Sequence, residues 1–150
     1  MTFLDDLPEG VRVGLDTGLF IYFVEDNPVY KPLVLPLFVD RLDQAWNEGV
    51  TSMVTLAEVL AQPLVKGRND LVLRYRNLLT GHPNLLLAMI AQPIAERAAD
   101  LSGRYRLRLP DAFQLATALE YGAGHFVTND LQLKKVAELQ GLVLDAYLPP

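Results

Sequence analysis

Short apolar runs alternate along the chain with stretches in which apolar side chains recur at three- and four-residue intervals. The short runs predict five β-strands, at residues 11–15, 50–54, 85–89, 125–128 and 142–144. The longer spacing predicts helices at residues 35–46, 55–62, 69–80, 93–101, 110–121 and 131–139. Strands that alternate with helices are typical of a parallel sheet covered by helices on both faces. The predicted fold class is therefore α/β, with three layers (α/β/α) around a central five-stranded parallel sheet.

The domain organisation that we expect is simple. The sequence has 150 residues, with no internal repeat, low-complexity tract or linker, and its 51% hydrophobic content is ample for a core. We expect residues 1–10 to form a short, loosely ordered acidic leader and residues 11–150 to form a single domain.

Composition excludes several classes of site. The chain has no cysteine, which excludes disulfides, thiolate metal sites and a cysteine nucleophile, and which suits the reducing cytoplasm where we expect the protein. The first six residues lack the basic and apolar segments of a signal peptide, and the longest apolar run, residues 85–91, is too short to span a bilayer, so we expect no membrane association. A net charge of −5 argues against a wholly basic surface for nucleic acid, although it allows a local basic strip.

Four acidic residues stand near points where strands give way to helices. Asp16 follows the first strand, Glu58 and Asp130 follow the second and the fourth, and Asp111 opens the helix before the fourth strand. In an open parallel sheet these points meet at the carboxyl edge, where ligands bind. Carboxylates gathered there repel each other by about 4 kcal/mol per pair at ~4 Å and an effective dielectric constant of ~20. A divalent cation would relieve that repulsion, so the pattern predicts a metal site built from oxygen ligands.

Each acid, taken alone, also has a purely structural explanation. Thr55 and Glu58 have the spacing of a capping box, in which Glu58 merely satisfies backbone donors. Asp111 lies in a first helical turn, where the helix dipole favours acids. Asp130 could cap a helix, and Asp16 could begin a turn. Separate explanations do not, however, predict that acids recur at three strand-to-helix junctions.

Four blocks of the sequence resemble the signature blocks of PIN-domain ribonucleases, most closely those of the VapC-type toxins of toxin–antitoxin pairs. In chain order these blocks are Leu-Asp-Thr-Gly-Leu-Phe-Ile (15–21), Thr-Leu-Ala-Glu-Val (55–59), Pro-Asp-Ala-Phe-Gln-Leu-Ala-Thr-Ala (110–118) and Val-Thr-Asn-Asp (127–130). No block is specific alone, but the four occur in the family's order over roughly residues 11–148. The resemblance implies a PIN-like fold and a Mg²⁺- or Mn²⁺-dependent endoribonuclease. It also implies a cognate antitoxin and a homodimer.

The chemistry assigns expected roles to these residues. Phosphodiester hydrolysis needs an activated water and a positive charge beside the phosphate, and a hard divalent cation supplies both. Asp16 and Asp111 are candidates to contact the metal, while Glu58 and Asp130 would complete the catalytic site directly or through waters. The residues that could orient these carboxylates by hydrogen bonds are Thr17, Thr128 and Asn129.

The first block departs from the family at one position. The family usually has Asn or Ser two residues after the first Asp, and this chain has Gly18. Thr17 could supply the missing hydrogen bond.

Two basic clusters are candidates for binding RNA or an acidic antitoxin segment. Arg104, Arg106 and Arg108 lead into Asp111 and include a tyrosine, so that the arginines could hold phosphates while the ring stacks on a base. The second cluster contains Lys66 and Arg68.

Three other functions compete with the ribonuclease. The tripeptide Asp16-Thr17-Gly18 also occurs in aspartic proteases, but those are all-β and the helical spacings argue against them. A phosphoacceptor receiver domain would need an Asp after the third strand and a Lys after the fifth, and the chain has neither. A non-catalytic RNA- or antitoxin-binding module of PIN-like fold stays open.

Overall fold

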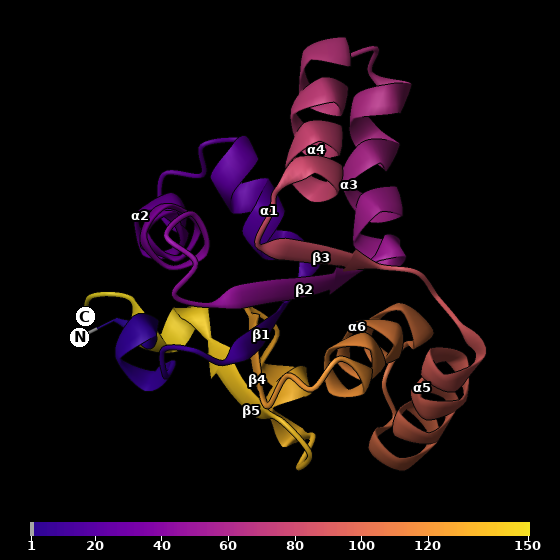
Figure 1. Cartoon of the computed structure of the whole chain (residues 1–150). Coiled ribbons are helices and arrows are strands. Elements are labelled where there is room, and N and C mark those ends of the chain that lie inside the picture. The colour runs from indigo at the N-terminus through magenta and orange to yellow at the C-terminus, as the bar shows by residue number, and fades with distance from the viewer. Residues whose placement is uncertain (1) are drawn as a thin grey trace.

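Five parallel strands form the centre of the structure, a computed structural model that describes residues 2–150 (Figure 1). The strands are β1 (Arg12–Leu15), β2 (Glu48–Ser52), β3 (Leu85–Ala88), β4 (His125–Thr128) and β5 (Gln140–Val143). Their order in the sheet is β3-β2-β1-β4-β5, so the chain winds outward from β1 in one direction and then returns to wind outward in the other. The predicted α/β class with a five-stranded parallel sheet is confirmed. The order reverses between β1 and β4, which is where open α/β sheets bind ligands.

Most helices follow the sequence pattern, although the helix at residues 17–24 is not among the predicted ranges, and four short segments are of other helical types. The α-helices are α1 (Thr17–Val24), α2 (Lys31–Pro36), α3 (Met53–Val65), α4 (Asn69–Gly81), α5 (Gln92–Tyr105) and α6 (Leu109–Glu120). A π-helical segment, η2 (Leu37–Leu42), continues α2. The 3₁₀ turns are η1 (Phe3–Asp6), η3 (Leu131–Lys135) and η4 (Leu144–Tyr147). None of the helices within residues 2–150 has both the length and the apolarity needed to span a membrane.

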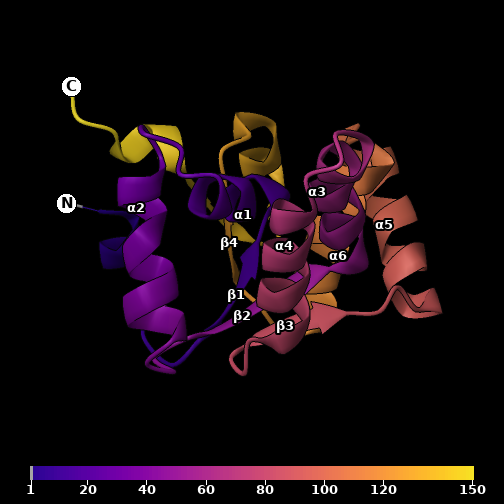
Figure 2. The ribbon, with the colours of Figure 1, turned by 90° about the horizontal axis from the view of Figure 1, so that it is seen from above.

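Two apolar cores lie on opposite faces of the sheet because successive strand residues point to opposite sides. Val13 and Leu15 of β1 join the core formed with α1, α2 and α4, while Val50 of β2 and Phe126 of β4 join the core formed with α5 and α6. In the view from above, α1 and α4 lie in front of the strands (Figure 2). The sheet is therefore covered on both faces, as the sequence predicts.

Gly14 lets helix α6 approach β1 closely. A Cβ atom at this position would lie 2.6 Å from the Phe126 ring and 2.7 Å from the Ala118 methyl group, too close for any side chain. Because α6 carries Asp111 and β1 leads into Asp16, this close packing brings two of the predicted site residues toward each other.

The acidic leader differs from the expected loose order. Thr2 caps η1, and both Phe3 and Leu7 are buried in the core on the α1 side of the sheet. The Tyr147 hydroxyl donates a hydrogen bond of 2.5 Å to Asp6, which ties the leader to the C-terminal turn. Two apolar side chains among the first seven residues are enough to anchor this segment.

Two predicted helices are shorter than the apolar spacing suggests. The helix predicted to reach Trp46 ends at Leu42, because Ala45 adopts a left-handed conformation (φ +60°) and Trp46 is 49% exposed. The segment 131–139 forms only the turn η3. Its apolar residues Leu133, Val136 and Leu139 are buried at three-residue spacing, which suits 3₁₀ turns rather than an α-helix.

Candidate functional site

All four predicted acids line one hollow of about 380 Å³ at the carboxyl edge of the sheet. We call it the acidic hollow, and its wall includes Asp16, Glu58, Asp111, Asp130, Thr17, Gly18, Tyr22, Arg108, Asn129 and Leu131. The acids come from four parts of the chain: the start of α1, the second turn of α3, the first turn of α6 and the loop after β4. The structure therefore brings the four acids together around the point where the strand order reverses.

Asp16 is the N-cap residue of α1 and the most constrained of the four acids. One carboxylate oxygen accepts a hydrogen bond of 2.8 Å from the Thr17 backbone, and the other accepts one of 2.6 Å from the Thr128 hydroxyl. Burial raises the pKa of Asp16, and the nearby charges of Asp111 and Glu58 raise it further, while the two hydrogen bonds oppose this shift. A cation in the hollow would counter both effects that disfavour the ionised form.

Glu58 faces the hollow and does not serve as a helix cap. The N-cap of α3 is Ser52, whose side chain accepts from the backbone of Val54, so the capping-box explanation of Glu58 is wrong. The Glu58 carboxylate instead accepts a hydrogen bond of 2.8 Å from the Thr17 hydroxyl. Thr17 thus supplies a side-chain hydrogen bond next to Gly18, as the sequence suggested.

A buried group of polar side chains, which we call the polar cluster, lies beneath the acids. The Gln114 amide of α6 donates to the Thr55 hydroxyl of α3 at 2.6 Å and to the Thr17 hydroxyl of α1 at 3.0 Å. The Thr51 hydroxyl lies 2.8 Å from that of Thr55. The cluster joins three helices directly behind Glu58. Sequence reasoning missed Gln114, and the one signal for it is a lone glutamine within an otherwise apolar helix segment; the structure leaves it only 2% exposed.

Asp111 is paired with an arginine of its own chain. The Arg108 guanidinium donates a hydrogen bond of 3.1 Å to the Asp111 carboxylate. This bond raises the pKa of Arg108, with further contributions from the charges of Asp111, Glu58 and Asp130. Arg108 therefore supplies positive charge to the acidic hollow. In this arrangement, no three acidic or histidine side chains among residues 2–150 are grouped closely enough to hold a metal ion.

Asp130 has a structural role as well as its place in the hollow. Its carboxylate accepts a hydrogen bond of 2.9 Å from the backbone of Gln132 and caps η3, as one of the explanations from sequence predicted. Asn129, a predicted orienting residue, makes no hydrogen bond to any of the four acids within the described chain. Its side-chain oxygen accepts from the Asp145 backbone at 2.9 Å, and its amide reaches the Tyr22 hydroxyl at 3.4 Å.

The structure separates the predicted basic residues into different surroundings. Arg104 forms ion pairs of 2.7 Å with Asp100 and Glu138 and does not line the acidic hollow. Arg68 is paired with Asp70 at 2.9 Å, and it lines a small hollow near Glu25 together with Lys66. Arg106 and Arg108, in contrast, line a hollow that adjoins the acidic hollow.

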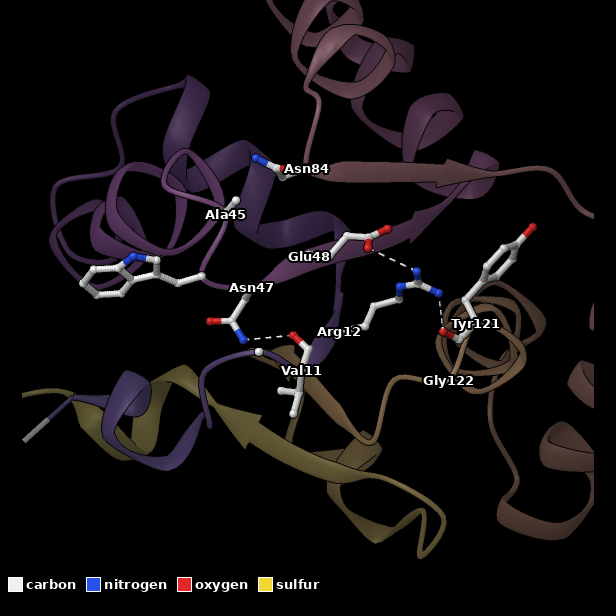
Figure 3. Close-up of a pocket in the computed structure, with 10 residues that line it drawn as sticks. Val11, Arg12, Ala45, Asn47, Glu48, Asn84, Tyr121 and Gly122 are labelled. Atoms are coloured by element: carbon white, nitrogen blue, oxygen red, sulfur yellow. Dashed lines mark hydrogen bonds and ion pairs between the residues drawn. The ribbon is translucent and has the colours of Figure 1, made fainter.

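A larger hollow, of about 480 Å³, lies at the opposite edge of the sheet, where the strands begin (Figure 3). Its polar side chains already make hydrogen bonds within the protein, mostly to backbone carbonyls. Arg12 donates to the Tyr121 carbonyl at 2.6 Å and to Glu48 at 3.1 Å, and Asn47 donates to the Val11 carbonyl at 2.9 Å. These bonds tie the start of β1 to its neighbours, so we interpret this hollow as structural.

Comparison with known families identifies the chain. Residues 13–139, which include all four acids, match the PIN domain. The chain belongs to the PIN-domain family. A comparison with curated proteins found no match.

Several solved structures share the fold of this PIN domain. VapC20 from Mycobacterium tuberculosis, described as a toxin that cleaves the sarcin–ricin loop, is 12% identical, with 87% of this chain and 99% of that chain covered and a TM-score of 0.66. VapBC2 from Rickettsia felis, solved with a promoter DNA fragment, is 14% identical (89% and 98% covered, TM-score 0.65). A toxin–antitoxin complex from Klebsiella pneumoniae is 24% identical (85% and 94% covered, TM-score 0.62). At these identities the likeness is one of fold.

The residues of this PIN domain fit a hard divalent cation in donor type and charge. Four carboxylates line the acidic hollow and offer only oxygen ligands, which Mg²⁺ and Mn²⁺ prefer. Asp111 would have to exchange its hydrogen bonds to Arg108 for contacts to the ion. The observation that favours a cation is electrostatic, because Asp16 is buried next to two further acids.

Proposed function

We propose that this protein is a Mg²⁺- or Mn²⁺-dependent endoribonuclease and the toxin of a type II toxin–antitoxin pair. One observation carries the proposal: four acids from separate parts of a PIN domain line a single hollow at the switch point of a parallel sheet. Membership of the family and the likeness in fold to VapC20, a toxin that cleaves RNA, support the same conclusion.

The side chains of the acidic hollow have different proposed roles in hydrolysis. In the proposed reaction a water oxygen bonds to phosphorus, the phosphorus–oxygen bond of the leaving nucleotide breaks, and the leaving oxygen takes up a proton. A bound divalent cation would lower the pKa of that water and counter the negative charge that grows on the phosphate. Asp16 and Asp111 would hold the cation, with Glu58 and Asp130 beside them. Thr128 keeps Asp16 in place, and Thr17 does the same for Glu58.

A cognate antitoxin is the proposed protein partner. The support comes from the structural neighbours, since those from Rickettsia felis and Klebsiella pneumoniae were solved as toxin–antitoxin assemblies. A homodimer and a cytoplasmic location stay predictions from the sequence and its family.

Cleavage of RNA by the purified chain tests the proposal. We expect the chain to cut total cellular RNA with Mg²⁺ or Mn²⁺, to stop in EDTA, and to resume when metal is restored. Asp16→Asn and Asp111→Asn should each reduce cleavage at least about a hundredfold, because the amide keeps the shape and removes the charge that binds the metal. Undiminished cleavage in both variants would mean a contaminating nuclease or a different site.

A non-catalytic RNA- or antitoxin-binding module is the alternative. Gly18, which departs from the family pattern, and the Arg108–Asp111 ion pair favour it. Calorimetric titration with Mn²⁺ separates the two functions. Stoichiometric binding together with metal-dependent cleavage supports the enzyme, whereas RNA binding with neither supports the module.

A further inference from the structure

A second hollow, of about 170 Å³, opens beside the acidic hollow and shares three residues with it. The shared residues are Arg108, Asp111 and Asp130. Its other polar side chains are Arg106, Gln132 and Lys135, and we call it the basic hollow. If the reacting phosphate of an RNA strand lay in the acidic hollow, the adjoining RNA backbone would lie next to the basic hollow.

The cations of the basic hollow are available to a ligand. Within residues 2–150, neither Arg106 nor Lys135 forms an ion pair. The only hydrogen bond of the Lys135 side chain in that range is a long one, 3.4 Å, to Gln132. Arg104, two residues before Arg106, differs because two carboxylates already hold it. Of the three arginines at 104, 106 and 108, two are therefore paired with acids, and Arg106 is the one without an ion pair within residues 2–150.

The backbone at Arg106 gives a second, independent reason to assign it a role. Arg106 ends α5 in the left-handed conformation, with φ +54°. Glycine is the usual residue at such a helix end because any side chain adds strain there. A strained position that carries a long cationic side chain, directed into a hollow beside the candidate active site, suggests a function.

We infer that the basic hollow binds a backbone phosphate of the RNA, next to the phosphate that is cut. Arg106 and Lys135 would contact that phosphate, and Gln132 could donate a further hydrogen bond. Asp111 and Asp130 belong to the wall shared with the acidic hollow. Once a cation neutralises them, the positive side chains of the basic hollow dominate its charge. The inference rests on the proposed function for the identity of the ligand as RNA.

Binding of a fluorescein-labelled single-stranded RNA of mixed sequence, measured by anisotropy with Mn²⁺ present, tests the inference. The full chain carries Glu58→Gln, which alters the proposed catalytic site so that the RNA stays intact, while Asp16 and Asp111 can still hold Mn²⁺. The test pair adds Arg106→Asn and Lys135→Gln, with asparagine chosen because it tolerates the left-handed conformation. The control pair instead adds Arg76→Gln and Lys134→Gln, which remove the same charge from exposed positions outside the basic hollow.

We expect the test pair to raise the Kd about tenfold or more, since hydrogen bonds to charged groups are strong. Its salt dependence should also flatten by about 0.7 in log–log slope for each phosphate that the protein no longer neutralises. The control pair should change either quantity much less, and Arg106→Lys should keep most of the affinity. Equal losses in the two pairs, or no loss in the test pair, would overturn the inference. Weakened binding of a glutamate-rich peptide with RNA binding intact would also overturn it, in favour of a protein partner.

The same variants in the chain with native Glu58 keep the outcome for the basic hollow separate from the outcome for the proposed function. If Mn²⁺-dependent cleavage is absent from the wild-type chain while the test pair alone weakens RNA binding, the proposed activity fails and the basic hollow stands. If the wild type cleaves and the test pair cleaves with an unchanged KM, the activity stands and the basic hollow fails. Thermal melting of each variant confirms that the comparison is between folded proteins.

Discussion

Arg108 occupies a place in the acidic hollow that a metal ion would have to share or take. Its hydrogen bonds to Asp111 hold one of the carboxylates proposed to bind the cation. The side chain is 77% exposed, so it can turn away at little cost. Arg108 and a divalent cation are therefore competitors for Asp111.

Arg108→Gln should bind Mn²⁺ more tightly than the wild type. An exposed ion pair is worth ~0.2–1 kcal/mol, so its loss should lower the Kd for Mn²⁺ by up to about fivefold in a calorimetric titration. Arg106→Gln is the matched control, because it removes the same charge from a residue that makes no ion pair within residues 2–150. Equal changes in the two variants would mean that overall charge, and not the contact with Asp111, governs the affinity.

The raised pKa of Asp16 predicts how stability depends on pH in metal-free protein. Burial makes the folded chain hold the Asp16 proton more tightly than the unfolded chain does, so ionisation of Asp16 opposes folding. That cost is absent well below 3.8, the ordinary pKa of an aspartate, and develops as the pH rises through the raised value. In EDTA, Asp16→Asn should therefore melt at a higher temperature than the wild type at neutral pH.

The pH dependence of this stabilisation tests whether ionisation of Asp16 is its cause. The advantage of Asp16→Asn should shrink as the pH falls toward 3.8, where both folded and unfolded wild-type chains take up the proton. Asp40→Asn, at an exposed position outside the hollow, is the control and should show no such pH-dependent gain. A gain for Asp16→Asn that stays constant across the titration would show that ionisation of Asp16 is not its cause.

Some single residues of the site could be predicted from sequence and others could not. Asp16, Glu58 and Asp130 stand out because acids at strand-to-helix junctions have a reason to meet, and Asp111 stands out because it opens the helix before the fourth strand. The pairing of Arg108 with Asp111 and the contacts of Gln114 could not be predicted, because they depend on side-chain directions that no periodicity encodes. Asn129 shows the opposite error, since its place beside Asp130 suggested a contact with the acids and its amide instead binds Tyr22 and the Asp145 backbone.

At the scale of the elements, the polar cluster fixes the positions of helices α1, α3 and α6 relative to one another. Each contributes a side chain to it, and the same three helices carry or adjoin Asp16, Glu58 and Asp111. A buried hydroxyl that accepts from Gln114 is costly to remove, because the buried amide then loses one of its two hydrogen-bond acceptors. The relative positions of three of the acids therefore depend on this cluster.

Thr55→Val should destabilise the protein by about 1–3 kcal/mol in urea unfolding, because it keeps the volume and leaves the Gln114 amide and the Thr51 hydroxyl short of a partner. Thr80→Val provides the comparison. Thr80 lies on the exposed side of α4, where its hydroxyl donates only to its own helix, and the change should stay within about 0.5 kcal/mol. Similar effects at both positions would mean that the cluster contributes nothing special.

Element types could be predicted better than element ends. The strand at 125–128 matches β4, and all five strands exist because their apolar runs are buried. The predicted junction at β2 is misplaced, since Ser52 caps α3 and the helix begins at Met53, two residues earlier than the sequence indicated. That error matters, because it made Glu58 look like part of a capping box. Local capping signals compete at neighbouring positions, and only tertiary packing decides between Ser52 and Thr55.

At the scale of the whole molecule, the topology of the sheet brings residues from distant parts of the sequence together at one site. Parallel strands all point their carboxyl ends to one edge, so Asp16, Glu58 and Asp130 had to lie on the same side. The strand order β3-β2-β1-β4-β5 then puts β1 and β4 next to each other, which joins Asp16 to the loop that carries Asp130. The sequence predicts the edge, while the closeness of α6 depends on contacts of Gly14 that only the structure shows.

Metal should stabilise the folded molecule as a whole if the four acids share one site. A ligand that binds only the native state adds RT ln(1 + [L]/Kd), which is ~2.7 kcal/mol when its concentration is a hundred times the Kd. Thermal melting of the wild type in EDTA and in saturating Mn²⁺ should therefore show a clear upward shift. Asp111→Asn should shift much less, because it loses a ligand and binds the ion more weakly.

The metal-free melts of the same two proteins complete the test. If the acids share a site, Asp111→Asn removes its repulsion with Asp16, although it also removes the ion pair with Arg108. Its melting temperature in EDTA should then stay close to that of the wild type or exceed it. If Asp111 is instead an independent first-turn acid, its loss should lower the melting temperature, by the ~0.3–1 kcal/mol of a helix-dipole contact. A melting temperature of Asp111→Asn below that of the wild type in EDTA, together with equal shifts of both proteins by Mn²⁺, would remove Asp111 from the proposed metal site.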